Sequence, residues 1–154
     1  MVFKRPAKKQ TEADLQSYAS TVAQILLNIG IDPQQAAMPV QQGYGWNFKR
    51  GSAMVEIYIA VHEGVGYLQV LSPLIELPQA NLLPLYRRLL ETNLQITAAA
   101  LGIHNDVVYV FHERPLEGLD SQEASNIINM IGAYADDLDD KLVQEFGGRL
   151  YGRI

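Results

Sequence analysis

Cysteine is absent from the 154-residue chain. This excludes thiol catalysis, disulfides, iron–sulfur clusters and zinc sites with thiolate ligands, and it fits a reducing compartment, so we expect a cytoplasmic protein. Long apolar runs are also missing: the longest, residues 96–103, has eight residues and includes Thr97 and Gly102. A membrane-spanning helix needs about 20. Residues 6–14 are polar where a signal peptide needs an apolar run. We therefore expect neither a membrane span nor a secretion signal.

Positive charge is scarce outside the first nine residues. Four of the twelve basic residues stand there, namely Lys4, Arg5, Lys8 and Lys9. Residues 10–154 carry eight basic and seventeen acidic residues, a net charge of −9. Because an acidic body repels a phosphate backbone, we expect no nucleic-acid partner. We interpret residues 1–10 as a flexible basic tail without an assigned role.

Residue patterns typical of catalysis or of metal binding are missing too. His62, His104 and His112 are the only histidines, and no two have the spacing that aims imidazoles at one metal. Ser52 follows Gly51 but lacks the second glycine of a nucleophile elbow. We therefore predict no catalytic residue, no metal and no cofactor, and interpret the protein as a non-enzyme. Four aspartates at positions 136, 137, 139 and 140 are interpreted as a solvated helix face.

Hydrophobic periodicity predicts where the helices and strands lie. A period of 3.6 residues predicts helices over 12–29, 81–93 and 121–146, with capping boxes at Thr11 and Asp120 and a cap at Asn81. A period of two predicts strands over 44–48, 55–62, 67–71, 96–103 and 107–113. The stretch 31–42, with two prolines and four glutamines, is interpreted as a connector.

The order of these elements, α-β-β-β-α-β-β-α, contains hairpins rather than βαβ crossovers. It predicts an α+β sandwich with a mainly antiparallel five-stranded sheet and helices packed on one face. We expect residues 11–147 to form one domain, followed by a C-terminal tail at 148–154.

Two features suggest contact with other molecules. Tyr58, Tyr67 and Leu71 have the strand parity opposite to the residues expected to face the helices, which leaves one sheet face partly exposed. With Trp46 they are our predicted partner-binding surface. The long helix 121–146 carries small residues at Gly132, Ala133 and Ala135 that would let a second copy approach, or Gly132 would kink the helix. We therefore infer a homodimer.

A further pattern combines the order of the predicted elements with a set of positions within residues 11–147, namely Leu89–Asn93, Ala98–Ile103, Val107–Arg114, Leu119, Glu123, Ala135, Asp136 and Leu142. In this pattern the chain resembles the YbjN-like family, whose fold is similar to that of type III secretion chaperones, the Tir-chaperone-like superfamily. The resemblance implies a small cytosolic homodimer that binds protein segments or acts as an adaptor. Its polar positions, Asn93, Glu113 and Asp136, are expected to have structural roles.

The resulting functional hypothesis is a non-enzymatic protein-interaction module, chaperone-like or adaptor-like, acting as a homodimer on a protein or peptide client. Its exposed sheet face or a strand edge would receive an extended or helical peptide. The alternative is a small-ligand sensor or enzyme with a pocket between helix 12–29 and the sheet, near His112 and Glu113.

Overall fold

The computed structural model describes residues 9–152. Its helices are α1 (Glu12–Asn28), α2 (Pro33–Ala36), α3 (Leu82–Asn93) and α4 (Ser121–Phe146). Its strands are β1 (Ala37–Met38), β2 (Tyr44–Arg50), β3 (Ala53–His62), β4 (Val65–Glu76), β5 (Ala100–His104), β6 (Val107–Pro115) and β7 (Arg149–Leu150).

All pairs of neighbouring strands are antiparallel, in the order β1-β2-β3-β4-β6-β5, with β7 beside the end of β4. The predicted α+β class is confirmed. The sheet has seven strands rather than five, because two-residue strands are added at β1 and β7.

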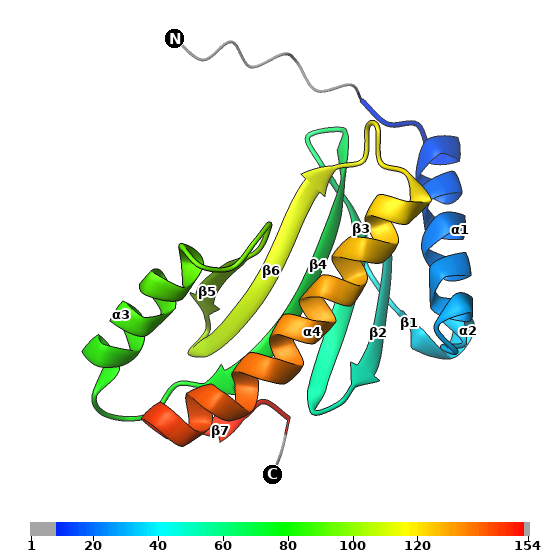
Figure 1. Cartoon of the computed structure of the whole chain (residues 1–154). Coiled ribbons are helices and arrows are strands. Elements are labelled where there is room, and N and C mark those ends of the chain that lie inside the picture. The colour runs from blue at the N-terminus through cyan, green and yellow to red at the C-terminus, as the bar shows by residue number, and fades with distance from the viewer. Residues whose placement is uncertain (1–8, 153–154) are drawn as a thin grey trace, which may run out of the picture.

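One face of the sheet packs against helices. In Figure 1, α4 runs diagonally across the sheet, with α1 on one side of it and α3 beside β5. Buried apolar side chains of α1, α3 and α4 form a single core with the inward residues of β2, β3, β4, β5 and β6. On β3 these inward residues are Val55, Ile57 and Ile59, none of which is exposed. Alternation along the strand therefore sends Glu56 and Tyr58 to the opposite face.

The helix starts follow their local sequence. Thr11 and Asp14 exchange side-chain to backbone hydrogen bonds of 3.1 and 3.0 Å, the capping box that the sequence predicts. Asp120 accepts the Glu123 N–H at 2.8 Å at the start of α4. Asn81 differs from the prediction: it precedes α3 in a left-handed conformation (φ 60°) and its side chain makes no capping bond.

Three short segments also differ from the prediction. The expected connector contains α2, capped by Asp32, and β1, which pairs with β2. β4 continues through Pro73 to Glu76, and a register shift between Pro73 and Ile75 gives the bulge at which proline is tolerated in a sheet. Residues 149–150, which the sequence assigns to a tail, pair with β4 as β7.

The small residues of α4 contact this chain's own hairpin. Gly132 lies against the Arg50 side chain, where an added Cβ would be 2.6 Å from the Arg50 Cδ, and Ala135 is fully buried. Because β2 and β3 already occupy this surface, Gly132 and Ala135 do not offer it to a second copy. α4 is continuous from Ser121 to Phe146.

Within residues 9–152, none of the helices combines the length and the apolar composition that crossing a bilayer demands.

Candidate functional site

The face of the sheet opposite the helices, here called the open face, is built by β3, β4, β5 and β6. Strand register sets its side chains in rows. One row runs from Glu56 through Leu71 to Phe111, and the next from Tyr58 through Gln69 to Glu113. Each neighbouring strand is about 4.8 Å away, so the two rows form a continuous surface.

An open depression of about 670 Å³ lies over these rows. Its lining includes Glu56, Tyr58, Gln69, Leu71, Tyr109 and Phe111. Phe111 is 40 % exposed, and the side chains of Tyr58, Leu71 and Tyr109 are partly exposed. An aromatic surface of this kind on the helix-free side of a sheet is typical of a contact site.

Glu56 lies within the aromatic part of the depression. Burial raises the pKa of its carboxyl above the ordinary value of 4.5, and a hydrogen bond from the Tyr58 hydroxyl partly opposes this shift. Burial also raises the pKa of Tyr58 and of Tyr109, and the negative charge of Glu56 adds to both shifts. The three groups therefore share a partly dehydrated environment.

Glu113, the second carboxylate of the open face, differs from Glu56 in its exposure and its partner. Its Oε2 accepts a hydrogen bond of 2.8 Å from the Gln69 Nε2 across the β4–β6 pair, and the residue is exposed.

The structure brings together only part of the predicted partner-binding surface. Tyr58 and Leu71 line the depression. Tyr67 lies on the same face, opposite Ala60 and Pro115, one row beyond the lining.

Trp46 lies on the wrong face for that surface. It is 6 % exposed, pairs with the core residue Ile57 and stacks on Tyr44 at a centroid distance of 6.1 Å. The physical reason is register: Trp46 shares the parity of Tyr44 and Phe48, and this parity points toward the helices.

Sequence reasoning missed Tyr109 and Phe111. The signal was present, because residues 107–113 alternate and the fully buried Val108 and Val110 occupy the other parity. Glu56 shares the strand parity of Tyr58, but its central place depends on the β3–β4–β6 register.

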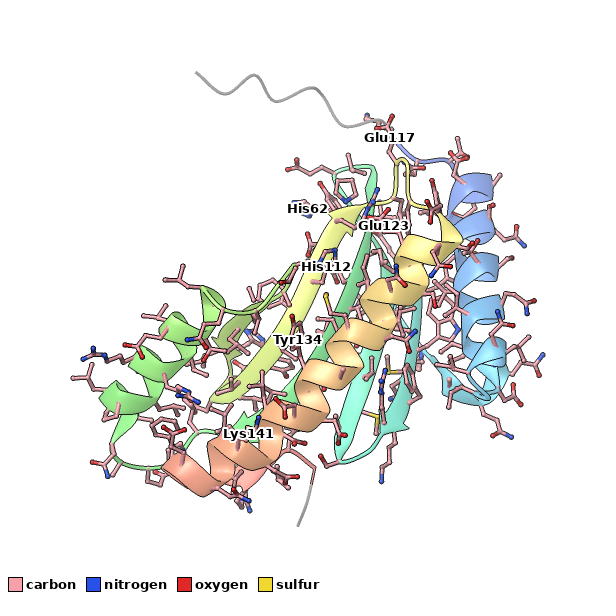
Figure 2. All side chains as sticks on the ribbon, in the orientation of Figure 1. His62, His112, Glu117, Glu123, Tyr134 and Lys141 are labelled. Atoms are coloured by element: carbon pink, nitrogen blue, oxygen red, sulfur yellow. The ribbon has the colours of Figure 1, made fainter. Side chains whose placement is uncertain are left out.

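The pocket of the alternative hypothesis does not have its predicted position. Leu15, Val22, Ile25 and Leu26 fill the space beneath α1, each no more than 6 % exposed. His112 shares the parity of Val110, and its Nδ1 is 2.5 Å from the Ala98 oxygen; Figure 2 shows it on β6, beside α4. Both residues belong to the lining of the open-face depression and not to a pocket beneath α1, and because Glu113 has the opposite parity its side chain points away from that of His112.

Asn93 has the structural role expected of it. Its Oδ1 accepts the Leu101 N–H at 2.7 Å and its Nδ2 donates to the Leu101 oxygen at 3.4 Å. The amide thus pairs with β5 as a neighbouring strand would, and holds it to α3.

Asn93→Ala is expected to lower the free energy of unfolding by about 1–2 kcal/mol, since it removes two partly buried hydrogen bonds. Amide exchange at Leu101 should accelerate more than exchange in β3. Urea denaturation and hydrogen exchange measure both effects, with the exposed Gln144→Ala as control. Equal stability of the two variants would contradict this role.

The aspartates of α4 are not all solvated. Asp139 is 2 % exposed. The Ser52 hydroxyl lies 2.6 Å from the Asp139 Oδ2 and 3.1 Å from the Asp136 Oδ1, and Asp136 also accepts the Ser52 N–H at 2.9 Å. The two carboxylates therefore hold the β2–β3 turn against α4 through hydrogen bonds.

Among residues 9–152, no group of three or more His, Asp and Glu side chains could hold a metal ion.

Comparison with known proteins agrees with this architecture. A family model described as T3SS (YopN, CesT) and YbjN peptide-binding chaperone 1 matches residues 37–153. No curated protein matches the chain. Two solved structures share the fold at 10 % sequence identity. The ExsC–ExsE complex has a TM-score of 0.62, covering 83 % of this chain and 95 % of that one. The HopA1–SchA chaperone–effector complex has a TM-score of 0.59, covering 83 % and 99 %.

Proposed function

Because the chain belongs to the family of type III secretion and YbjN peptide-binding chaperones, we propose that its open face binds a segment of a client protein. The protein then acts as a chaperone or adaptor and not as an enzyme. The observation that carries this proposal is the aromatic depression on the helix-free face. The absence of cysteine supports a cytoplasmic site of action.

The energetics of the open face suit a peptide. Tyr58, Tyr109 and Phe111 each keep apolar surface accessible to solvent. Fully burying one large exposed apolar side chain contributes about 1.5–3 kcal/mol, and covering these partly exposed side chains contributes a share of that free energy toward the cost of ordering a short segment. The aromatic residues stand on β3 and β6, two strands apart. We therefore propose that the segment lies across the face and not along the outer edge of β5.

The solved neighbours support a protein client. HopA1–SchA is a chaperone–effector complex, and ExsC–ExsE is also a complex of two proteins. Their fold matches this chain over 83 % of its length. A client segment on this chain is consistent with both.

Selection from a random library of peptides of about 12 residues tests the proposal, since such a segment spans a sheet of this size. Peptides that bind the wild-type protein are then titrated into isotope-labelled protein. We expect the largest amide shift changes in β3, β4 and β6, around Tyr58, Leu71 and Phe111. Changes concentrated on α1 and α2, or a selection that yields no binder, would refute the proposal.

The homodimer is a further part of the proposed function, and α3 supplies its surface. Leu83, Leu90 and Leu94 are 79 %, 68 % and 92 % exposed. Their spacing of seven and four residues sets them on one side of the helix. Leu85 and Leu89, on the other side, are buried in the core. An apolar helix stripe of this kind becomes covered when two copies pack together.

Arginine at both Leu83 and Leu90 is expected to convert the dimer to a monomer, because two charges would be buried in the interface. Light scattering at about 100 μM, a concentration that reveals micromolar association, measures the mass. Leu27→Arg, at an exposed leucine of α1, should leave the dimer intact. A wild-type monomer at this concentration, or a dimeric double variant, would rule out this interface.

A further inference from the structure

Glu56 is a partly buried carboxylate that faces hydroxyls and rings. Its neighbours on the open face are Tyr58, two positions along β3, and Leu71, directly opposite on β4. Tyr109 and Tyr151 lie near enough to interact electrostatically with the Tyr58 hydroxyl. The described lining of the depression includes two carboxylates and two histidines but no lysine or arginine.

A nearby cation would stabilise the ionised carboxylate of Glu56, and the described lining of the depression supplies no lysine or arginine for this purpose. The ionised form loses hydration on burial, and the Tyr58 hydroxyl restores only one hydrogen bond. A lysine or arginine side chain of a bound segment, placed next to Glu56, would neutralise the negative charge of its carboxylate. It would also donate charge-assisted hydrogen bonds to the remaining carboxylate lone pairs.

The rings around Glu56 favour the same kind of ligand. Tyr58, Tyr109 and Phe111 belong to the lining, and the faces of such rings attract ammonium and guanidinium groups. Their apolar edges also accommodate the methylene stem of a long cationic side chain. β3 and β6 are separated by β4 alone, so the floor between them is about 10 Å wide. This width admits one extended side chain.

We propose that the open face selects client segments in which a lysine or arginine, placed on Glu56, is followed on one side by apolar residues that cover Leu71 and Phe111. This inference rests on the proposed function, since it names the class of segment that the same face binds. Glu113 is not required, because it is exposed and is already bonded to Gln69.

The test uses the peptides from the library selection. Lysine or arginine should be enriched at one position, with apolar residues on one side of it. Replacing that residue by glutamine should weaken binding by at least about tenfold, the effect of losing a close charge pair. Glu56→Gln should weaken binding of the parent peptide by the same factor. In this variant, replacing the basic residue of the peptide by glutamine should have almost no further effect on affinity. Glu117→Gln, in the exposed loop before α4, is the matched control and should change nothing.

A charge exchange completes the experiment. Glu56→Lys should reject the parent peptide and bind the version with glutamate at the selected position. The difference in affinity between the two peptides should persist in about 0.5 M salt, because salt screens exposed charges far more than covered ones. Fluorescence anisotropy gives the affinities, and circular dichroism shows that each variant is folded; Glu56→Gln, nearly isosteric, remains informative if Glu56→Lys unfolds.

The outcomes separate this inference from the proposed function. Peptides that bind the open face without enrichment of a basic residue, and that bind Glu56→Gln unchanged, overturn the inference and leave the proposed function standing. A selection without binders overturns both. If Glu56→Gln alters self-association and not peptide affinity, a second copy covers the face, and the inference fails.

Discussion

Threonine at both Tyr58 and Phe111 is expected to weaken binding of a selected peptide by at least about hundredfold, because each aromatic contact contributes more than about 1.4 kcal/mol. The variant should remain folded. Both side chains lie on the open face and outside the core, and threonine keeps the β-propensity of β3 and β6. Fluorescence anisotropy measures the affinity, and the thermal unfolding midpoint reports the fold.

The matched control removes apolar surface elsewhere. Leu27 and Ile29, at the end of α1, are 55 % and 39 % exposed. Threonine at both positions should leave peptide affinity unchanged. Equal losses in the two double variants would mean that the peptides bind exposed apolar surface without preference, and the open face would lose its assigned role.

Ser52→Ala is the second substitution with a large expected effect. It should lower the free energy of unfolding near pH 7 by about 2 kcal/mol, because the buried Asp139 carboxylate then loses its hydroxyl donor. Asp139 is the critical partner: the Ser52 hydroxyl is 2.6 Å from it, and the residue is 2 % exposed. Chemical denaturation gives the difference.

The pH dependence of this effect has a definite sign. Burial raises the pKa of Asp139 above its ordinary value of 3.8, and hydrogen bonds from Ser52 and from the Asp140 backbone oppose the shift. The folded protein therefore binds this proton more tightly than the unfolded chain. The stabilisation from this group is complete below the ordinary pKa and is lost as the pH rises through the folded-state value. The cost of Ser52→Ala should accordingly shrink in acid, as the carboxyl becomes neutral.

Asp139→Asn provides the complementary variant. Its oxygen can accept the Asp140 N–H, as Asp139 Oδ1 does at 2.7 Å. Its amide can donate to the Ser52 hydroxyl, which is left to donate to Asp136. We expect the free energy of unfolding of this variant to match or exceed the wild-type value near neutral pH and to change less with pH in acid. If the loss of unfolding free energy caused by Ser52→Ala stays constant between about pH 4 and pH 7, the assignment of its pH dependence to Asp139 is contradicted.

Local sequence signals predicted the parts of the fold that local interactions determine. Thr11 and Asp14 cap α1 as expected, and α4 spans Ser121–Phe146, the range that the helical period predicts, with Asp120 as its N-cap. Asn105 and Asp106 take positive φ angles of 49° and 62° in the β5–β6 turn, as their side chains permit.

Non-local pairing explains what the sequence did not predict. β1 and β7 are two residues long, too short for any period, and exist because β2 and β4 offer them a partner. Asp139 looks like a solvated helix residue until the β2–β3 turn brings Ser52 to it. Three residues of the open face, Tyr58, Tyr67 and Leu71, were recognised from their strand parity. Trp46 was misplaced because parity alone does not say which face the helices cover.

The position of β6 between β4 and β5 has a consequence for the order of folding. The β2–β3–β4 meander is local in sequence, whereas pairing of β6 with β4 must close a loop over residues 77–106, which contains α3 and β5. Loop closure of this length is slower and entropically costlier than forming a hairpin. During synthesis, a chain that has not yet reached Val107 holds Glu56 and Leu71 but lacks Tyr109 and Phe111. The open face is thus among the last parts of the molecule to be completed.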